Sequence, residues 1–276
     1  MFIKVGEFMS IENLYKNAIC EWYKEYLFEY RCCPDQYFSG LTKDKHTLKW
    51  SFSLEKISDV TRSDVNYEKI NSQNKNVVIV LLESPHTMEF IGVVGPAKGT
   101  TGQQIIKCLP SILNGDSITV LDGKGASHNI TFTTNEFVKV INDVDLIVMN
   151  RIQYQTSLGI EPISPTKVRN IIFQKLWSNF EVKLSLYNRL KSIIDHYEKV
   201  IILDACTSDI REVTKETDVI IYPKTEHNSG SIYAMSLKHP SSWHSYSGWN
   251  DINSFEIMSP PTKPIDLSEG TVQGGN

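Results

Sequence analysis

The sequence lacks any run approaching the roughly 20 consecutive apolar residues of a membrane-spanning helix, so no transmembrane helix is expected. It also lacks an apolar segment followed by a small-residue cleavage site near residue 1, and we predict no secretory signal. Neither sign of charge is in large excess, because 28 Lys and Arg residues face 32 Asp and Glu residues, for a net charge of −4. This balance is not that of a protein that coats nucleic acid, although it permits a local basic cleft.

Cysteines are few and irregularly spaced. The 5 cysteines are at positions 20, 32, 33, 108 and 206, and no Cys-x-x-Cys pair occurs. An odd number with two adjacent residues is not a disulfide framework, so a reducing cytoplasm is the expected location. The spacing also disfavours an iron–sulfur cluster, and a zinc site at Cys32, Cys33 and His46 has no usual ligand spacing to support it. We therefore expect neither a metal nor a cofactor.

Strand-like and helical patterns alternate from residue 76 onward. Continuous β-branched runs, typical of strands buried on both faces, occupy 77–84, 145–150, 199–205, 219–222 and 232–237. Apolar residues at helical spacing lie between them, at 101–113, 165–177 and 182–200. This alternation predicts an α/β fold, with three α/β/α layers around a central, mostly parallel sheet. Residues 115–135 predict a hairpin insertion around the sequence DGKG.

The chain is expected to fall into three parts. Residues 1–75 would form an N-terminal helical extension packed on the core, because 10–30 have helical spacing and 34–75 have the polar, aperiodic composition of loop with short helices. Residues 76–258 would form the main domain. Residues 259–276 are rich in Pro and Gly and poor in apolar residues, and predict a flexible tail.

Polar residues directly follow three of the predicted strands. They are Glu83 to His86, Asn150 with Arg151, and Lys238 to Ser241. In open α/β sheets, binding sites form outside the carboxyl ends of the strands. We therefore predict that the three segments meet at one site, although each of these residues taken alone could have a purely structural role.

Four segments resemble the signatures of the uracil-DNA glycosylase superfamily: LLESPHTMEF, GPAKGTTGQQI, LIVMN and LKHPSSWHS, in this order. The resemblance covers residues 77–250 with long unmatched stretches, and its most specific piece is His239-Pro240-Ser241. It implies a uracil-DNA glycosylase-like fold, with 76–258 as the catalytic domain. It also implies a monofunctional, metal-independent DNA glycosylase, which flips a base out of DNA, excises it and leaves an abasic site.

The resemblance assigns roles to individual residues. Asn150 would read the edge of a pyrimidine with its amide, and His239 would stabilise the negative charge on the departing base. Glu83 would position the attacking water, with Glu89 as the alternative. The further residues expected to contact substrate or DNA are Ser84, Pro85, His86, Lys98, Gly99, Thr101, Gln103, Arg151, Lys238, Ser241 and Trp243.

Trp243 stands where the superfamily has an apolar wedge that fills the gap left by the flipped nucleotide. Its polar neighbours Ser242, His244 and Ser245 favour an exposed loop over a core position. The stretch from Gly95 to Gly102 would let the chain approach a phosphate closely at the start of a helix.

Two departures from the superfamily bear on the substrate. Ser84 stands where the housekeeping enzymes have a water-activating Asp, and His86 where they have the Tyr that excludes 5-substituted bases. We therefore expect a bulky 5-substituted cytosine, such as glucosylated 5-hydroxymethylcytosine in phage DNA, and hence a role in antiviral defence.

Three alternatives stay open: a uracil-DNA glycosylase of base-excision DNA repair, a catalytically inactive module that binds a modified base, and an α/β nucleotide hydrolase with a metal-binding Asp cluster. The expected partner is DNA, without a membrane, and the chain is expected to be a monomer.

Overall fold

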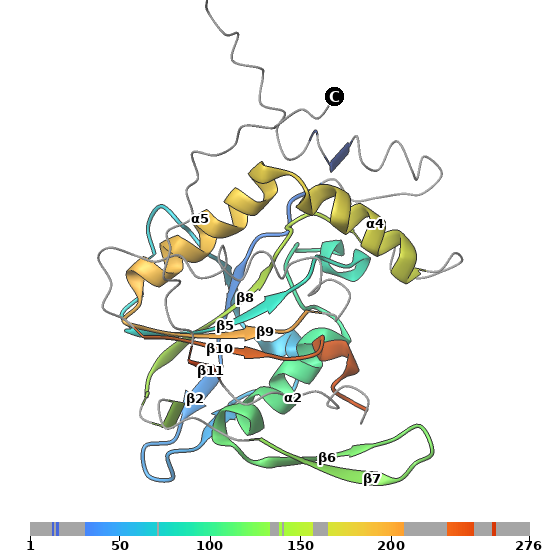
Figure 1. Ribbon diagram of the computed structural model, residues 1–276. Helices are drawn as coiled ribbons and strands as arrows, with labels where there is room; N and C mark the ends of the chain where they lie inside the picture. Colours follow the sequence, from blue (N-terminus) through green and yellow to red (C-terminus); the bar gives the residue numbers. More distant parts are fainter. Residues whose placement is uncertain are drawn as a thin grey trace, which may run out of the picture.

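The sheet at the centre of the molecule has seven strands in the order β11-β10-β9-β5-β8-β1-β4. The structure, a computed structural model, describes residues 13, 15–16, 31–70, 72–132, 138–139, 141–156, 165–206, 231–245 and 256–257. The strands of this sheet are β1 (Gln36–Phe38), β4 (Arg62–Asp64), β5 (Asn76–Leu82), β8 (Val144–Asn150), β9 (Lys199–Asp204), β10 (Ser231–Ser236) and β11 (Glu256–Ile257). Together with the helices on it, the sheet confirms the predicted α/β class (Figure 1).

The four central strands are parallel. β5 pairs with β8 on one side and with β9 on the other, and β9 pairs with β10. In chain order these strands are arranged second, first, third and fourth, which is a doubly wound order. The direction of winding changes between β5 and β9, and ligands of such sheets bind outside the carboxyl ends of the strands near this point.

Helices cover both faces of the sheet, because successive side chains of a strand point to opposite sides. Val78, Val80 and Leu82 of β5 share a buried cluster with apolar residues of α2 (Thr100–Asn114). The alternate residues of β5 pack with α4 (Pro165–Trp177) and α5 (Phe180–His196). Figure 1 accordingly shows α2 on one side of the sheet and α4 and α5 on the other. α2, α4 and strands β5, β8, β9 and β10 agree with the predicted ranges to within two residues, whereas α5 ends at His196 and not at residue 200 as predicted.

The segment expected to be loop with short helices contains strands instead. Within 34–70 lie β1, β2 (Leu41–Lys43), β3 (Trp50–Phe52), the short 3-10 helix η1 (Ile57–Asp59) and β4. β1 pairs antiparallel with β8, and β4 pairs antiparallel with β1, so both extend the main sheet. The expectation was wrong because strands of three residues are too short to produce a recognisable period. Most of 10–30, together with 219–222 and 259–276, lies outside the described residues.

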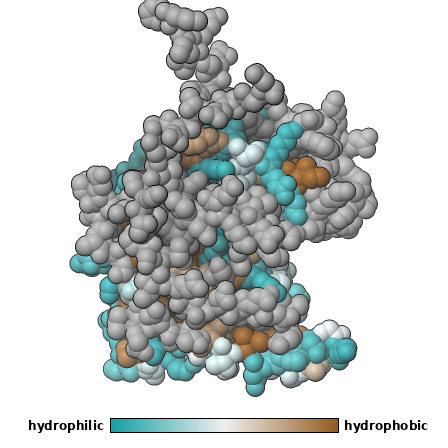
Figure 2. All heavy atoms as spheres, in the orientation of Figure 1, coloured by the Kyte–Doolittle hydropathy of each residue, from teal (hydrophilic) through white to brown (hydrophobic). Residues whose placement is uncertain are grey.

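The predicted hairpin is present as β6 (Ser117–Leu121) paired with β7 (Ser127–Thr131). It projects on the α2 side of the sheet in Figure 1, and the coloured surface over it in Figure 2 is mainly hydrophilic. Leu121 forms an isolated bridge with Ser245, which ties the hairpin to the segment after β10. No helix among the described residues is long and apolar enough to cross a membrane.

Candidate functional site

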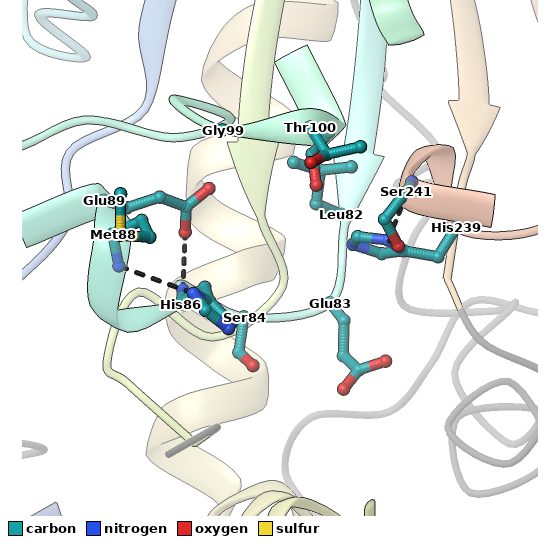
Figure 3. A pocket seen from close by; sticks show the side chains of 11 residues that line it. Leu82, Glu83, Ser84, His86, Met88, Glu89, Gly99, Thr100, His239 and Ser241 are labelled. Atoms are coloured by element: carbon teal, nitrogen blue, oxygen red, sulfur yellow. Dashed lines mark hydrogen bonds between the residues drawn. The ribbon is translucent and has the colours of Figure 1, made fainter. Parts of the chain in front are cut away.

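A pocket of about 410 Å³ lies at the carboxyl ends of the parallel strands. Its walls come from three places: the segment after β5, the first turn of α2 and the segment after β10 (Figure 3). The lining residues are Leu82, Glu83, Ser84, His86, Met88, Glu89, Gly99, Thr100, Thr101, His239 and Ser241. The structure thus brings together residues of two predicted segments that are more than 150 positions apart in the chain.

The segment after β5 forms the 3-10 helix η2 (Thr87–Phe90) and is held by Glu89. The Glu89 carboxylate accepts hydrogen bonds from the backbone N–H groups of His86 and Ala97. Burial raises the pKa of Glu89 from 4.5 to about 7, even though these two N–H donors act in the opposite direction. Glu89 therefore has a structural role in this segment, and its ionisation falls near neutral pH.

Glu83 is 3% exposed and begins the segment after β5. Its backbone oxygen accepts a hydrogen bond from Ile152, which follows β8. Figure 3 shows its carboxyl group pointing away from the His239 ring. Its neighbour Ser84 has its hydroxyl oxygen 2.5 Å from that of Thr156. The two predicted carboxylates, Glu83 and Glu89, thus both border the pocket, from different sides.

His239 stands at the start of the 3-10 helix η4 (Pro240–Ser242), which follows β10. Its Nδ1 accepts a hydrogen bond from the backbone N–H of Ser241 at 3.3 Å and lies 2.8 Å from the Ser241 hydroxyl oxygen. A neutral imidazole that accepts at Nδ1 carries its proton on Nε2. His239 can therefore offer an N–H donor at the pocket.

Asn150 ends β8 and is the register partner of Leu82, which lines the pocket. Its side chain is fully buried and does not itself line the pocket. Nδ2 lies 3.8 Å from Sγ of Cys33, and Oδ1 has no hydrogen-bond partner among the described residues. Because Oδ1 has no partner, it can still accept a hydrogen bond. An unsatisfied buried oxygen lowers the stability of a protein by about 1–3 kcal/mol.

A buried ion pair holds the backbone of Asn150. The Asp35 carboxylate accepts the Asn150 N–H at 3.3 Å, and Arg189 of α5 donates to the Asn150 carbonyl oxygen at 3.0 Å. Arg189 also donates to Asp35 and to the Arg151 carbonyl oxygen. Burial disfavours the Arg189 charge, but the nearby Asp35 carboxylate leaves the pKa of Arg189 raised.

Arg151 was expected to contact DNA, and the structure contradicts this. Its side chain is only 1% exposed. It donates to Asp204 at 2.6 Å and to Sγ of Cys206 at 2.9 Å. Burial opposes its charge, but Asp204 more than compensates, and the pKa of Arg151 is raised. A guanidinium committed to a buried pair cannot also reach a phosphate on the surface.

Trp243 was expected in an exposed loop as the wedge, and this expectation is also wrong. It is 1% exposed, belongs to the cluster on the α2 face, and donates from Nε1 to the Lys238 carbonyl oxygen at 2.7 Å. Its polar neighbours Ser242 and Ser245 are partly buried and form local hydrogen bonds, while His244 is exposed. Ser242 donates its hydroxyl to the His239 carbonyl oxygen at 2.8 Å, and Ser245 donates to that of Ser242 at 3.2 Å.

Other predicted contacts lie beside the pocket and bond within the protein. Lys98 donates to the Ile91 carbonyl oxygen at 2.6 Å, and Gln103 donates to that of Glu55 at 3.0 Å. Pro85 and Lys238 flank lining residues without lining the pocket. Sequence reasoning did not single out Met88 or Thr100, which do line it, although both lie within the quoted segments, because neither was assigned a chemical role.

No group of three or more His, Cys, Asp or Glu side chains within the described ranges could hold a metal ion. Comparisons of the chain with protein-family models, curated proteins and solved structures find no match. The chemistry of the pocket is therefore the guide to function.

Proposed function

We propose that the protein is a DNA glycosylase that excises a modified pyrimidine, on a three-layer fold like that of the uracil-DNA glycosylase superfamily. The observation that carries the proposal is that Glu83 and His239 line the same pocket at the carboxyl ends of the parallel strands. In the reaction, water attacks C1′ of the sugar and the bond from C1′ to the base breaks. The hydroxyl group stays on the sugar, and the second proton of the water leaves with the base.

His239 is proposed to stabilise the departing base. Negative charge develops on the base as the glycosidic bond breaks, and the Nε2–H that follows from the bond at Nδ1 would donate to it. Such a donor acts on the transition state more than on the bound substrate, because the charge is not yet present before the bond stretches. Loss of one donor of this kind typically lowers the turnover rate about 10²-fold to 10³-fold.

A carboxylate is proposed to position the water and to stabilise the positive charge on the sugar. Glu83 is the first candidate because Glu89 already accepts two backbone N–H groups. Replacement of each by Gln separates these roles. Glu83→Gln should abolish turnover, whereas Glu89→Gln should chiefly alter the stability of the segment after β5.

Asn150 is proposed to read the base. With Nδ2 directed to Cys33, the unpaired Oδ1 would accept a hydrogen bond from a base N–H, which both uracil and cytosine offer. Because Asn150 does not line the pocket, this role requires the base to reach past its neighbour Leu82. Asn150→Ala would therefore reduce discrimination between bases more than it reduces the binding of DNA backbone.

The size and lining of the pocket favour a bulky base. A volume of about 410 Å³ falls in the range of pockets for ligands of drug size, which is the size class of a glucosylated base. His86 lines this pocket at the position where the superfamily has the Tyr that excludes 5-substituents. A cytosine carrying glucosylated 5-hydroxymethyl is accordingly the preferred substrate, and a role in defence against phages with such DNA would follow.

The test is base release from two DNAs, one containing uracil and one containing glucosylated 5-hydroxymethylcytosine. Free base is identified by mass spectrometry, and abasic sites are scored by strand cleavage after alkali. His239→Ala should lower the rate about 10²-fold or more, and His46→Ala, at an exposed position in a turn, is the matched control. Binding without release of either base would replace the proposed enzyme by a base-binding module, and release of uracil alone would indicate a repair enzyme.

A further inference from the structure

Three exposed apolar side chains are concentrated in the segment beside the pocket. Met88 is 47% exposed, Ile91 is 61% exposed and Val93 is 83% exposed. Only three other large apolar side chains among the described residues are exposed to a comparable degree, and those are scattered: Leu48, Leu121 and Phe180. We call the segment from Met88 to Val94 the apolar loop. Since Met88 also lines the pocket, this loop forms part of its rim.

Hydrogen bonds to backbone carbonyl oxygens fix the conformation of the apolar loop. Gly95 donates its N–H to the Glu89 carbonyl oxygen at 3.0 Å, which closes the loop. Gln36 donates to the carbonyl oxygen of Val94 at 3.1 Å. These hydrogen bonds fix the backbone that carries the exposed side chains of Ile91 and Val93. The loop can therefore contact a partner without losing its conformation.

Cations surround the base of the same loop. Arg31 donates to the Phe90 carbonyl oxygen at 2.9 Å, and Lys98 donates to that of Ile91 at 2.6 Å. Just beyond the loop, Arg62 donates to the Pro96 carbonyl oxygen at 2.6 Å. Of the carboxylates near the loop, Glu89 is buried, and Asp64 accepts a hydrogen bond at 2.8 Å from the Gln36 amide. An apolar tip with cations around its base is complementary to a stack of bases flanked by phosphates.

We infer that the apolar loop is the wedge that enters a DNA duplex beside the pocket. This inference rests on the proposed function, in which a nucleotide leaves the stack and a gap must be filled. Ile and Met are among the side chains that proteins insert between base steps, and Trp243, buried in the core, cannot serve. Ile91 and Val93 would occupy the gap, and the charges of Arg31 and Lys98 at the base of the loop would attract the flanking phosphates.

The test uses the double variant Ile91→Ser with Val93→Ser, in which both changes are at exposed positions. The control is Leu48→Ser, at an apolar position that is 58% exposed and distant in sequence. The probe is a duplex with a tetrahydrofuran abasic analogue next to 2-aminopurine, whose fluorescence rises on unstacking. The matched single strand serves as the second ligand, and thermal unfolding checks that each variant is folded.

The double variant should bind the duplex about 10-fold to 150-fold more weakly than the wild type, the loss that corresponds to burial of one aliphatic side chain. Its affinity for the single strand should be unchanged, and the rise in 2-aminopurine fluorescence should disappear. Equal losses on both ligands, or wild-type behaviour on the duplex, would overturn the wedge. A different outcome would assign the loop to a protein interface instead: the wild type self-associates, the double variant does not, and the two proteins bind DNA equally well.

Base release, measured on the same variants, separates this inference from the proposed function. Release by the wild type combined with unchanged duplex binding by the double variant refutes only the wedge. If the wild type releases no base, but the double variant loses duplex binding and the rise in 2-aminopurine fluorescence, only the glycosylase activity is refuted.

Discussion

Glu89 connects the stability of the pocket to pH. Its pKa is raised from 4.5 to about 7, with burial as the main cause. The folded protein therefore binds this proton more tightly than the unfolded chain. The stabilisation from the protonated form is complete below pH 4.5 and is lost as the pH rises toward 7. The difference of about 2.5 pKa units corresponds to roughly 3 kcal/mol, at about 1.36 kcal/mol per unit.

The perturbation is Glu89→Gln, which removes the ionisation while keeping the shape of the side chain. Urea unfolding of both proteins from pH 4.5 to pH 8 gives the free energy of unfolding at each pH. Gln also places an N–H₂ group near the backbone N–H groups of His86 and Ala97, which adds a cost that does not vary with pH. The difference between wild type and variant should thus fall by about 3 kcal/mol across this window and then level off.

A difference that stays constant across the window would refute this reasoning. It would mean that the two backbone N–H donors keep the buried carboxylate ionised at every pH tested, in spite of its desolvation. Glu68→Gln, at an exposed position, controls for the substitution itself.

Two further predictions concern residues that are buried in the protein and do not line the pocket. Trp243→Ala should lower the free energy of unfolding by about 3–5 kcal/mol, measured by urea denaturation, and a loss below about 1 kcal/mol would be incompatible with its core position. Arg189→Met should destabilise by about 3–5 kcal/mol because it leaves the Asp35 carboxylate buried without its cation. The double variant that adds Asp35→Asn should recover part of that loss in the same assay, and strictly additive losses would show that the pair is not coupled.

The central part of the fold could be predicted from sequence because its strands are buried on both faces. A strand such as β5, with six of its seven residues buried, has a continuous apolar run that few other structures produce. The helices between the strands carry apolar residues at helical spacing for the same reason. β1 and β4 could not be predicted, since three residues contain too little pattern and their pairing depends on β8 and on each other.

The sequence predicted a pocket residue correctly only where its distance from the end of a strand is enough to place it at the pocket. Glu83 directly follows β5, and His239 lies just beyond β10. Both residues line the pocket. Arg151 and Trp243 occupy similar positions but point into the protein. Their burial depends on Asp204 and on the fold of η4, neither of which a local sequence pattern reveals.

The ion pair between Asp35 and Arg189 means that the conformation at the end of β8 depends on residues far from it in the sequence. Asp35 lies 115 positions before Asn150, and Arg189 lies 39 positions after it. Contacts between residues so far apart in the chain carry a large entropic cost of loop closure. A fragment that starts at β5 would retain the amide but lose the carboxylate that grips its backbone. The conformation at the end of β8 thus depends on residues far before and after this strand, and not on the loops alone.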